Sequence, residues 1–314
     1  MPDPVSPPPL LTVIIPTHNP HPERLRRTLA GLREQTLPPD QWECIVVDNA
    51  STPPVDSATL TSAGPATLRL VRESQPGLTH ARKAGLRSAR GALMVFADDD
   101  NVLAPDYLAQ SLRLAAAHPR LGAYGGRSVP EFEGPPESWT HEFFDLLALR
   151  DLGPHPVQAA AESPLRGYPR CAPIGAGMVL RREAADVWLA APDRGLTDRR
   201  GSELTSGGDN DIVLTLFAAG WGVGYFPELQ LTHLIPAGRL DAGYLARLNR
   251  GIQKSWVQVL ARHGICPWPP IATWTVPLRQ FKAWFTCRAW RGAVGQIRWQ
   301  GACGHFEGRA IIAP

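Results

Sequence analysis

Three consecutive aspartates follow a strongly apolar run in the stretch MVFADDDNVLAP, residues 94–105. Adjacent like charges repel, and a buried ionised carboxylate without a partner is costly. One acidic residue would be enough to cap the helix that Pro105 suggests. The presence of Asp98, Asp99 and Asp100 together therefore favours a bound cation or a proton-transfer role over capping alone.

The spacing of these aspartates is suited to a hard divalent cation. If the strand continues through them, Asp98 and Asp100 point to one side and Asp99 to the other. Two carboxylates on the same side can hold Mg²⁺ or Mn²⁺ together with a diphosphate. Such an ion neutralises charge on a leaving phosphate. An EF-hand calcium loop is excluded, because its glycine and terminal glutamate are missing from the required positions.

Strand-like and helical patterns alternate through the first hundred residues. The strand-like segments are 12–16, 43–48, 67–72 and 92–97, and the helical ones are 22–35 and 77–90. Apolar runs that alternate with helices predict a doubly wound α/β fold with a mostly parallel sheet. Polar clusters at 16–19, 48–51 and 98–101 follow three of these strands. Ligands bind at the carboxyl ends of strands in such sheets.

The second half of the chain is less regular. We expect a helix at 105–117, a strand at 121–129, and then a long Pro/Gly-rich loop through Cys171. A strand-like turn runs into a helix over 172–190, and a further helix follows at 209–220. The Gly-, Ser- and Arg-rich segment 193–208 is expected to be a mobile loop that closes over a substrate.

The order of TVIIPTHN, IVVDNAS, GLTHARKAG, VFADDDN, GGDNDI and LTH resembles family 2 glycosyltransferases of the GT-A fold, over about residues 11–236. The resemblance implies inverting transfer of a sugar from a nucleotide-diphosphate donor to a hydroxyl acceptor, with Mn²⁺ or Mg²⁺ as cofactor. It also implies a Rossmann-like nucleotide-binding half over 11–127 and an acceptor or catalytic half over 128–236. Outside them, residues 1–10 are expected to be disordered, and residues 237–314 to form a helical Trp/Arg-rich extension.

The resemblance also assigns site residues, beginning with Asp98 and Asp100 as the D-x-D motif. With His233 they would hold the metal: a lone histidine is more often structural than a ligand, but the resemblance favours the ligand role for His233. The residues assigned to the nucleotide sugar are Pro16, Thr17, Asn19, Asp48, Arg82, Lys83, Asp98 and Asp99. Asp48 would accept a hydrogen bond from the base, or else shape a turn. Lys83 departs from the family's usual asparagine, so a solvated surface lysine is an equal alternative.

The predicted catalytic base lies in GGDNDI, at the start of the last helix of the resemblance. Asp209 matches the catalytic aspartate and Asp211 the second acidic position, while Gly208 replaces the usual glutamate. A helix N-terminus favours the charged carboxylate, and a capping role for Asp209 is compatible with catalysis. The floor on the acceptor side is assigned to Gly175, Ala176, Gly177 and Met178.

Composition narrows the class of protein and its location. Five scattered cysteines, without a C-x-x-C pair, argue against a disulfide framework and a zinc site. A net charge of +3 does not indicate nucleic acid. The proline-rich N-terminus lacks a signal-peptide pattern, and the apolar runs are too short to span a bilayer. We therefore expect a cytoplasmic protein, and a peripheral position on the inner face of the plasma membrane stays open as a refinement.

The tail combines tryptophans with basic residues over 268–299. Two interpretations stay open: a peripheral membrane contact, or helices that pack on the main domain with arginines reaching solvent.

Three functions are candidates for the whole chain. The first is a glycosyltransferase that uses a UDP-, GDP- or dTDP-sugar and a glycan or glycolipid acceptor, in cell-surface glycan or glycolipid synthesis. The second is a haloacid dehalogenase-like phosphatase, because DDDNV fits its D-x-D-x-[TV] pattern, but that motif should follow the first strand. The third, a non-catalytic nucleotide- or sugar-binding module, would not need a downstream carboxylate such as Asp209.

Overall fold

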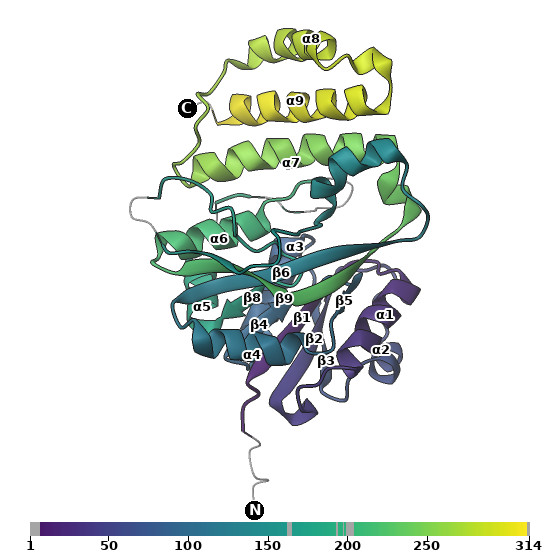
Figure 1. Ribbon diagram of the computed structural model, residues 1–314, viewed down its shortest axis with the longest axis vertical. Coiled ribbons are helices and arrows are strands. Elements are labelled where there is room, and N and C mark those ends of the chain that lie inside the picture. Colours follow the sequence, from purple (N-terminus) through teal and green to yellow (C-terminus); the bar gives the residue numbers. More distant parts are fainter. Residues whose placement is uncertain (1–6, 162–164, 193, 197, 199–203, 313–314) are drawn as a thin grey trace, which may run out of the picture.

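The computed structural model describes residues 7–161, 165–192, 194–196, 198 and 204–312 (Figure 1). The strands of these residues are β1 (Leu11–Thr17), β2 (Trp42–Asn49), β3 (Leu68–Glu73), β4 (Leu93–Phe96), β5 (Asn101–Leu103), β6 (Leu121–Phe132), β7 (Val157–Ala159), β8 (Val179–Arg181) and β9 (Gly222–Ile235). They form one sheet with the order β3-β2-β1-β4-β8-β6-β9-β5, and β7 pairs with β9.

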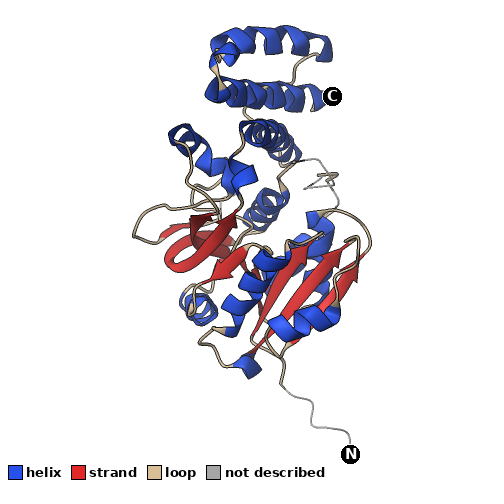
Figure 2. Cartoon of the chain, turned by 90° about the vertical axis from the view of Figure 1, so that its right-hand side faces the viewer, coloured by secondary structure: helices blue, strands red, loops and turns tan. Residues whose placement is uncertain are grey.

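Helices cover both faces of this sheet (Figures 1 and 2). The α-helices are α1 (Pro22–Arg33), α2 (Ser57–Ala63), α3 (Leu78–Ser88), α4 (Tyr107–Ala117), α5 (Arg182–Ala190), α6 (Gly208–Ala218), α7 (Ala242–Arg262), α8 (Val276–Thr286) and α9 (Ala293–Ile311). The 3₁₀ helices are η1 (Pro39–Gln41), η2 (Ser138–Leu147), η3 (Ala237–Leu240), η4 (Thr273–Thr275) and η5 (Ala289–Arg291).

Side-chain alternation in the central strands explains the two covered faces. In β1, Val13 and Ile15 belong to a core that includes leucines of α1, α2 and α4. Ile14, between them, belongs to a second core with residues of α3, α5 and α6. Since successive side chains of a strand point to opposite faces, a strand buried on both sides reads as a continuous apolar run. The predicted doubly wound α/β class is confirmed.

The strand order places a topological switch point next to the aspartate cluster. Strands β1 to β4 are parallel, and β1 lies between β2 and β4. The chain leaves β1 toward β2 and β3 and then returns to its other side as β4. This arrangement opens a crevice at the carboxyl ends of β1 and β4. Beyond β4 the sheet is mixed, because β8 runs antiparallel to its neighbours and β6 runs parallel to β9.

The region expected as one long loop contains some regular structure. The 3₁₀ helix η2 and the short strand β7 lie within it. Strand β5, directly after the aspartates, was also not predicted, because three residues carry too little periodicity. It pairs antiparallel with β9, and the register puts Asn101 opposite His233. This pairing brings Asn101 next to His233, which lies 132 positions later in the sequence.

The C-terminal helices form a stack at one end of the molecule (Figures 1 and 2). Helix α7 joins the stack to the sheet through a core that contains Phe143, Ile235, Leu248 and Ile297. Helix α9 approaches α7 closely at Gly304, where an added Cβ would lie 2.0 Å from the backbone oxygen of Arg250. Among the described residues, no helix has the length and apolar character needed to cross a membrane.

Candidate active site

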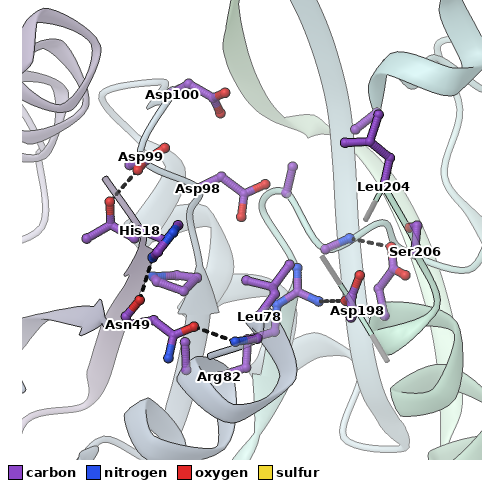
Figure 3. Close-up of a pocket in the computed structure, with 18 of the residues that line it drawn as sticks. His18, Asn49, Leu78, Arg82, Asp98, Asp99, Asp100, Asp198, Leu204 and Ser206 are labelled. Carbon is purple, nitrogen blue, oxygen red and sulfur yellow. Dashed lines mark hydrogen bonds and ion pairs between the residues drawn. The ribbon is translucent and has the colours of Figure 1, made fainter. Parts of the chain in front are cut away.

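A cavity of about 440 Å³ lies at the carboxyl ends of β1 and β4, at the switch point (Figure 3). Its walls come from segments far apart in the sequence. The lining residues are Pro16, Thr17, His18, Asn49, Pro76, Gly77, Leu78, Ala81, Arg82, Asp98, Asp99, Asp100, Ala148, Gly175, Ala176, Asp198, Leu204, Ser206, Asp209, His233, Arg239 and Tyr244. A volume of this size accommodates a nucleotide-sized ligand.

The three aspartates form one wall of the cavity (Figure 3). The side chain of Asn101 orders their loop: its oxygen accepts from the backbone N–H of Asp98 at 3.0 Å, and its amide donates to Asp100 at 3.1 Å. The hydroxyl of Thr17 donates to Asp99. Burial, followed by the charge of Asp100, raises the pKa of Asp99 to about 7. Near neutral pH this wall therefore carries less negative charge than three full carboxylates.

Asp100 lies in a small polar cluster with His233 and Arg239. Its Oδ2 is 3.0 Å from Nη2 of Arg239, and its Oδ1 is 3.5 Å from Nε2 of His233. Nη1 of Arg239 is 3.0 Å from the same Nε2. Because a guanidinium can only donate, Nε2 of His233 accepts in this contact, and its lone pair points at the Arg239 guanidinium. The antiparallel pairing of β5 with β9 holds Asp100 beside His233, since the backbone N–H of Leu234 donates to the backbone oxygen of Asp100 at 2.8 Å.

The donor set of this cluster suits a divalent cation that arrives with a diphosphate. A carboxylate and an imidazole lone pair already converge on a positive group, the Arg239 guanidinium. In the described part of the chain, no three His, Cys, Asp or Glu side chains form a ready-made metal site. Mg²⁺ usually binds through one or two carboxylates plus substrate phosphates and water, so two protein ligands are compatible with it.

Arg82 dominates the opposite wall (Figure 3). Its side chain is 4 % exposed, and its guanidinium lies 3.7 Å from Asp198 and stands over the ring of Phe96 at 5.3 Å. Its Nε and Nη1 are buried and have no hydrogen-bond partner among the described residues. Unsatisfied buried donors are rare, and those of a charged group are especially costly. The cavity therefore has a cationic group with spare donors, suited to an anionic ligand.

Asp209 projects into the cavity from the first turn of α6. Its Oδ2 accepts from the backbone N–H of Gly175 at 3.1 Å, and its Oδ1 accepts from the N–H of Asn210 at 2.9 Å. The first contact ties the start of α6 to the GAGM turn. A carboxylate held in this way can take a proton from a hydroxyl group that enters the cavity.

Ten residues assigned from the sequence come together at this cavity. They are Pro16, Thr17, Arg82, Asp98, Asp99, Asp100, Gly175, Ala176, Asp209 and His233.

Three nucleotide-side assignments, Asp48, Asn19 and Lys83, are not among the residues that line the cavity. Asp48 is buried and accepts from the backbone N–H groups of Ser51 and Val55 and from Arg72. Burial opposes its ionisation, but these hydrogen bonds and the arginine charge outweigh burial and lower its pKa. The side-chain oxygen of Asn19 accepts from the backbone N–H of Thr52, which lies in the same loop after β2 as Ser51 and Val55. Lys83 stands over the ring of Trp188 at 5.1 Å and borders a separate small cavity.

On the acceptor side, Gly175 and Ala176 line the cavity, but Gly177 and Met178 do not. Gly177 has φ +74° and its carbonyl accepts from the hydroxyl of Tyr107, so it shapes the turn. Met178 is fully buried in the core.

Asp211 also lies outside the lining. It is 2.8 Å from both Trp188 Nε1 and His263 Nε2, and 3.5 Å from Arg194. Burial opposes its ionisation, but hydrogen bonds from His263 and Trp188 outweigh burial and lower its pKa. In this arrangement Asp211 links α6 to the end of α7.

Sequence reasoning missed several lining residues. Nδ1 of His18 is 2.7 Å from the backbone oxygen of Asn49, and the side chain of Asn49 accepts from the N–H of Gly77. Asp198 and Arg239 approach from segments without a regular pattern, so no periodicity signals them. The sequence predicts a mobile lid over 193–208, but residues 193, 197 and 199–203 of this segment lie outside the described residues.

Comparison with known proteins identifies the family. The model of Glycosyl transferase family 2 matches residues 12–188. Validoxylamine A glucosyltransferase of Streptomyces hygroscopicus subsp. limoneus is 34% identical over 163 residues, which cover 50% of this chain and 36% of that protein. Putative glycosyltransferase EpsH of Bacillus subtilis (strain 168) is 33% identical over 92 residues, covering 29% and 26%. The chain thus spans well under two thirds of these relatives.

A crystal structure of S. aureus TarS, residues 1–349, superposes with a TM-score of 0.49 and 14% identity, covering 95% of this chain and 90% of that chain. The family match covers more than half of the 314 residues, so the chain belongs to glycosyl transferase family 2.

Proposed function

We propose that this protein is a metal-dependent, inverting glycosyltransferase. It moves a sugar from a UDP-, GDP- or dTDP-sugar to a hydroxyl group of a glycan or glycolipid, in cell-surface glycan synthesis. The observation that carries the proposal is a cavity that holds both a carboxylate cluster and the buried Arg82, two of whose donors have no hydrogen-bond partner among the described residues. Family membership supports the reaction class. It also argues against a haloacid dehalogenase-like phosphatase, whose aspartate motif would follow the first strand rather than β4.

The residues divide the work between the two walls. Arg82 donates to the donor diphosphate, and Asp98 and Asp99 contact the sugar and ribose end beside Pro16 and Thr17. Asn49 borders the place proposed for the base, and Asp48 and Asn19 hold the loop behind it.

The metal belongs to the acidic wall. Asp100 and His233 would hold Mn²⁺ or Mg²⁺, with Asp98 beside them. When bound, the ion supplies charge neutralisation for the leaving diphosphate.

The acceptor enters from the side of Gly175 and Ala176. Asp209 takes the proton of its hydroxyl group, and an in-line approach behind the anomeric carbon gives inversion. Asp211 supports the helix that carries Asp209 through its contacts with Trp188 and His263. Lys83 contributes to the same packing from the ring face of Trp188.

We place the enzyme in the cytoplasm, at the inner face of the plasma membrane, where nucleotide sugars and lipid-linked acceptors meet. The proposal is tested by thermal-shift measurements with UDP, GDP and dTDP, with and without Mn²⁺. A ligand that binds the folded state raises the unfolding temperature by mass action. A nucleoside diphosphate that stabilises the protein only with Mn²⁺ supports the proposal. If none of the three stabilises it, a nucleotide-sugar donor site is ruled out.

A further inference from the structure

The outer surface of the C-terminal helices carries an exposed apolar stripe. Trp274, Leu278, Phe281 and Phe285 are 75%, 64%, 65% and 50% exposed. Their spacing of four, three and four residues places them on one side of α8 and the turn before it. The opposite side of α8 packs on α9, where Nε1 of Trp299 donates to the oxygen of Gln280 at 3.0 Å. Helix α8 is the outermost element at this end of the molecule (Figures 1 and 2).

The stripe continues into an aromatic cluster at the end of α8. The rings of Phe281 and Phe285 are 5.0 Å apart, and those of Trp284 and Trp290 are 4.8 Å apart. Phe285 joins the two pairs, at 5.0 Å from Trp284 and 5.8 Å from Trp290, which is itself 51% exposed. Single exposed apolar residues are ordinary, but a contiguous exposed patch marks an interaction surface.

Charge is strongly segregated toward this end of the chain. Residues 242–314 contain ten Lys and Arg but a single acidic residue, Glu307, so their net charge is +9. Since the whole chain carries +3, residues 1–241 carry −6. Arg279, Lys282 and Arg288 are exposed beside the aromatic residues. The charge distribution therefore favours an anionic partner at this end and disfavours one at the other.

We infer that the surface formed by the apolar stripe, the aromatic cluster and these basic residues lies on an anionic lipid bilayer. Tryptophan and phenylalanine beside Arg and Lys suit the interface, where rings enter the headgroup region and cations meet lipid phosphates. A second copy of the chain would bring a like-charged surface against this one, which is unfavourable. No described helix can span a bilayer, so the contact is at the surface. Helix α7 belongs to the same stack, and its Tyr244 lines the cavity, so docking would fix the orientation of the cavity relative to the membrane.

The inference is tested by vesicle sedimentation without any donor, so its outcome is independent of the proposed function. One set of vesicles contains phosphatidylcholine alone and the other also contains phosphatidylglycerol. We expect binding to the anionic set and its loss at high salt. The double variant Leu278→Ser/Phe281→Ser should bind about tenfold more weakly, as less apolar surface is buried. Its control is Leu152→Ser/Val157→Ser, at residues 40% and 41% exposed elsewhere.

The contribution of the basic residues to vesicle binding is tested by two charge-reversal variants, one on the proposed surface and one elsewhere. Arg279→Glu/Lys282→Glu should weaken binding by more than about tenfold, because each basic residue near an anionic surface contributes about fivefold. Arg33→Glu/Arg87→Glu, at exposed positions on α1 and α3, should bind like the wild type. Equal binding to both kinds of vesicle, no binding to either, or equal losses in test and control variants would overturn the inference. So would a dimer, measured by light scattering, that becomes monomeric in Leu278→Ser/Phe281→Ser without any vesicle binding.

Discussion

Substitution of Gly175 by alanine tests whether the position of Arg82 matters for donor binding. A Cβ at residue 175 would lie 2.2 Å from Nη2 of Arg82 and 3.0 Å from its Cζ. Contacts this short force the guanidinium to move. Arg82 is buried between Asp198 and the ring of Phe96, so any movement gives up one of these contacts. The methyl group that Gly175→Ala adds would thus shift the guanidinium charge of Arg82 without removing it.

Two magnitudes follow from this geometry. The free energy of unfolding should fall by about 1–2 kcal/mol, because overpacking beside a flexible side chain lies at the lower end of its usual range. In a chain of this size such a loss lowers the melting temperature by a few degrees. The affinity for a nucleoside diphosphate should fall more, because a lost charge-assisted hydrogen bond costs about 1.5–3 kcal/mol. This corresponds to a roughly ten- to hundredfold larger Kd.

Calorimetric titration of the nucleoside diphosphate in the presence of Mn²⁺ measures the effect. Gly134→Ala is the matched control, because an added Cβ there has no heavy atom within 4 Å. Both variants should fold, and only Gly175→Ala should bind weakly. If Gly175→Ala binds the nucleotide as the wild type does, the guanidinium of Arg82 does not contact the diphosphate from its present position.

Further predictions concern stability and metal dependence. Glu43 is buried, and although burial opposes its ionisation, hydrogen bonds from Arg90 and Arg69 lower its pKa. The contribution of the ionised Glu43 to the free energy of unfolding is therefore present above its pKa in the unfolded state, and it is lost as the pH falls through its lower pKa in the folded state. At neutral pH, Glu43→Gln should lower the free energy of unfolding, measured with denaturant, by about 2 kcal/mol. That difference should shrink in acid, and a constant difference would contradict the assignment. Arg239→Ala should strengthen Mn²⁺ binding about tenfold in a titration without nucleotide, because the guanidinium that pairs with Asp100 no longer competes; weaker binding would show that Arg239 assists the metal. A chelator should weaken nucleoside diphosphate binding in calorimetry, and equal affinities would refute a metal-dependent donor site.

The elements that hold the donor half were predictable from local pattern. Strands such as β1 are continuous apolar runs between polar turns, and the polar clusters after β1 and β4 do meet at one cavity. The parallel order follows from strand and helix alternation, which needs no knowledge of distant contacts.

The remaining features depend on contacts between distant segments. Three-residue β5 has no readable period, yet its pairing with β9 brings Asp100 to His233. Asp48 lies at the end of β2, as expected, but the loop after β2 turns back so that its backbone N–H groups donate to both carboxylate oxygens of Asp48. The spacing of Asp209 and Asp211 on a helix shows that they point in different directions, but not which of them faces the cavity.

The most direct test of Asp209 as the catalytic base is a rate measurement on Asp209→Asn. The assay follows the release of nucleoside diphosphate from the nucleotide sugar that binds best, with water or a supplied hydroxyl compound as acceptor. Removal of a positioned base typically costs 10²–10⁴-fold in rate. Donor binding should change little, because Arg82 and Asp100 are unaltered on the other walls of the cavity. We predict a loss of this size with donor affinity within a few-fold of the wild type. A folded Asp209→Asn protein that binds donor and turns it over at the wild-type rate would contradict the assignment of Asp209 as the base.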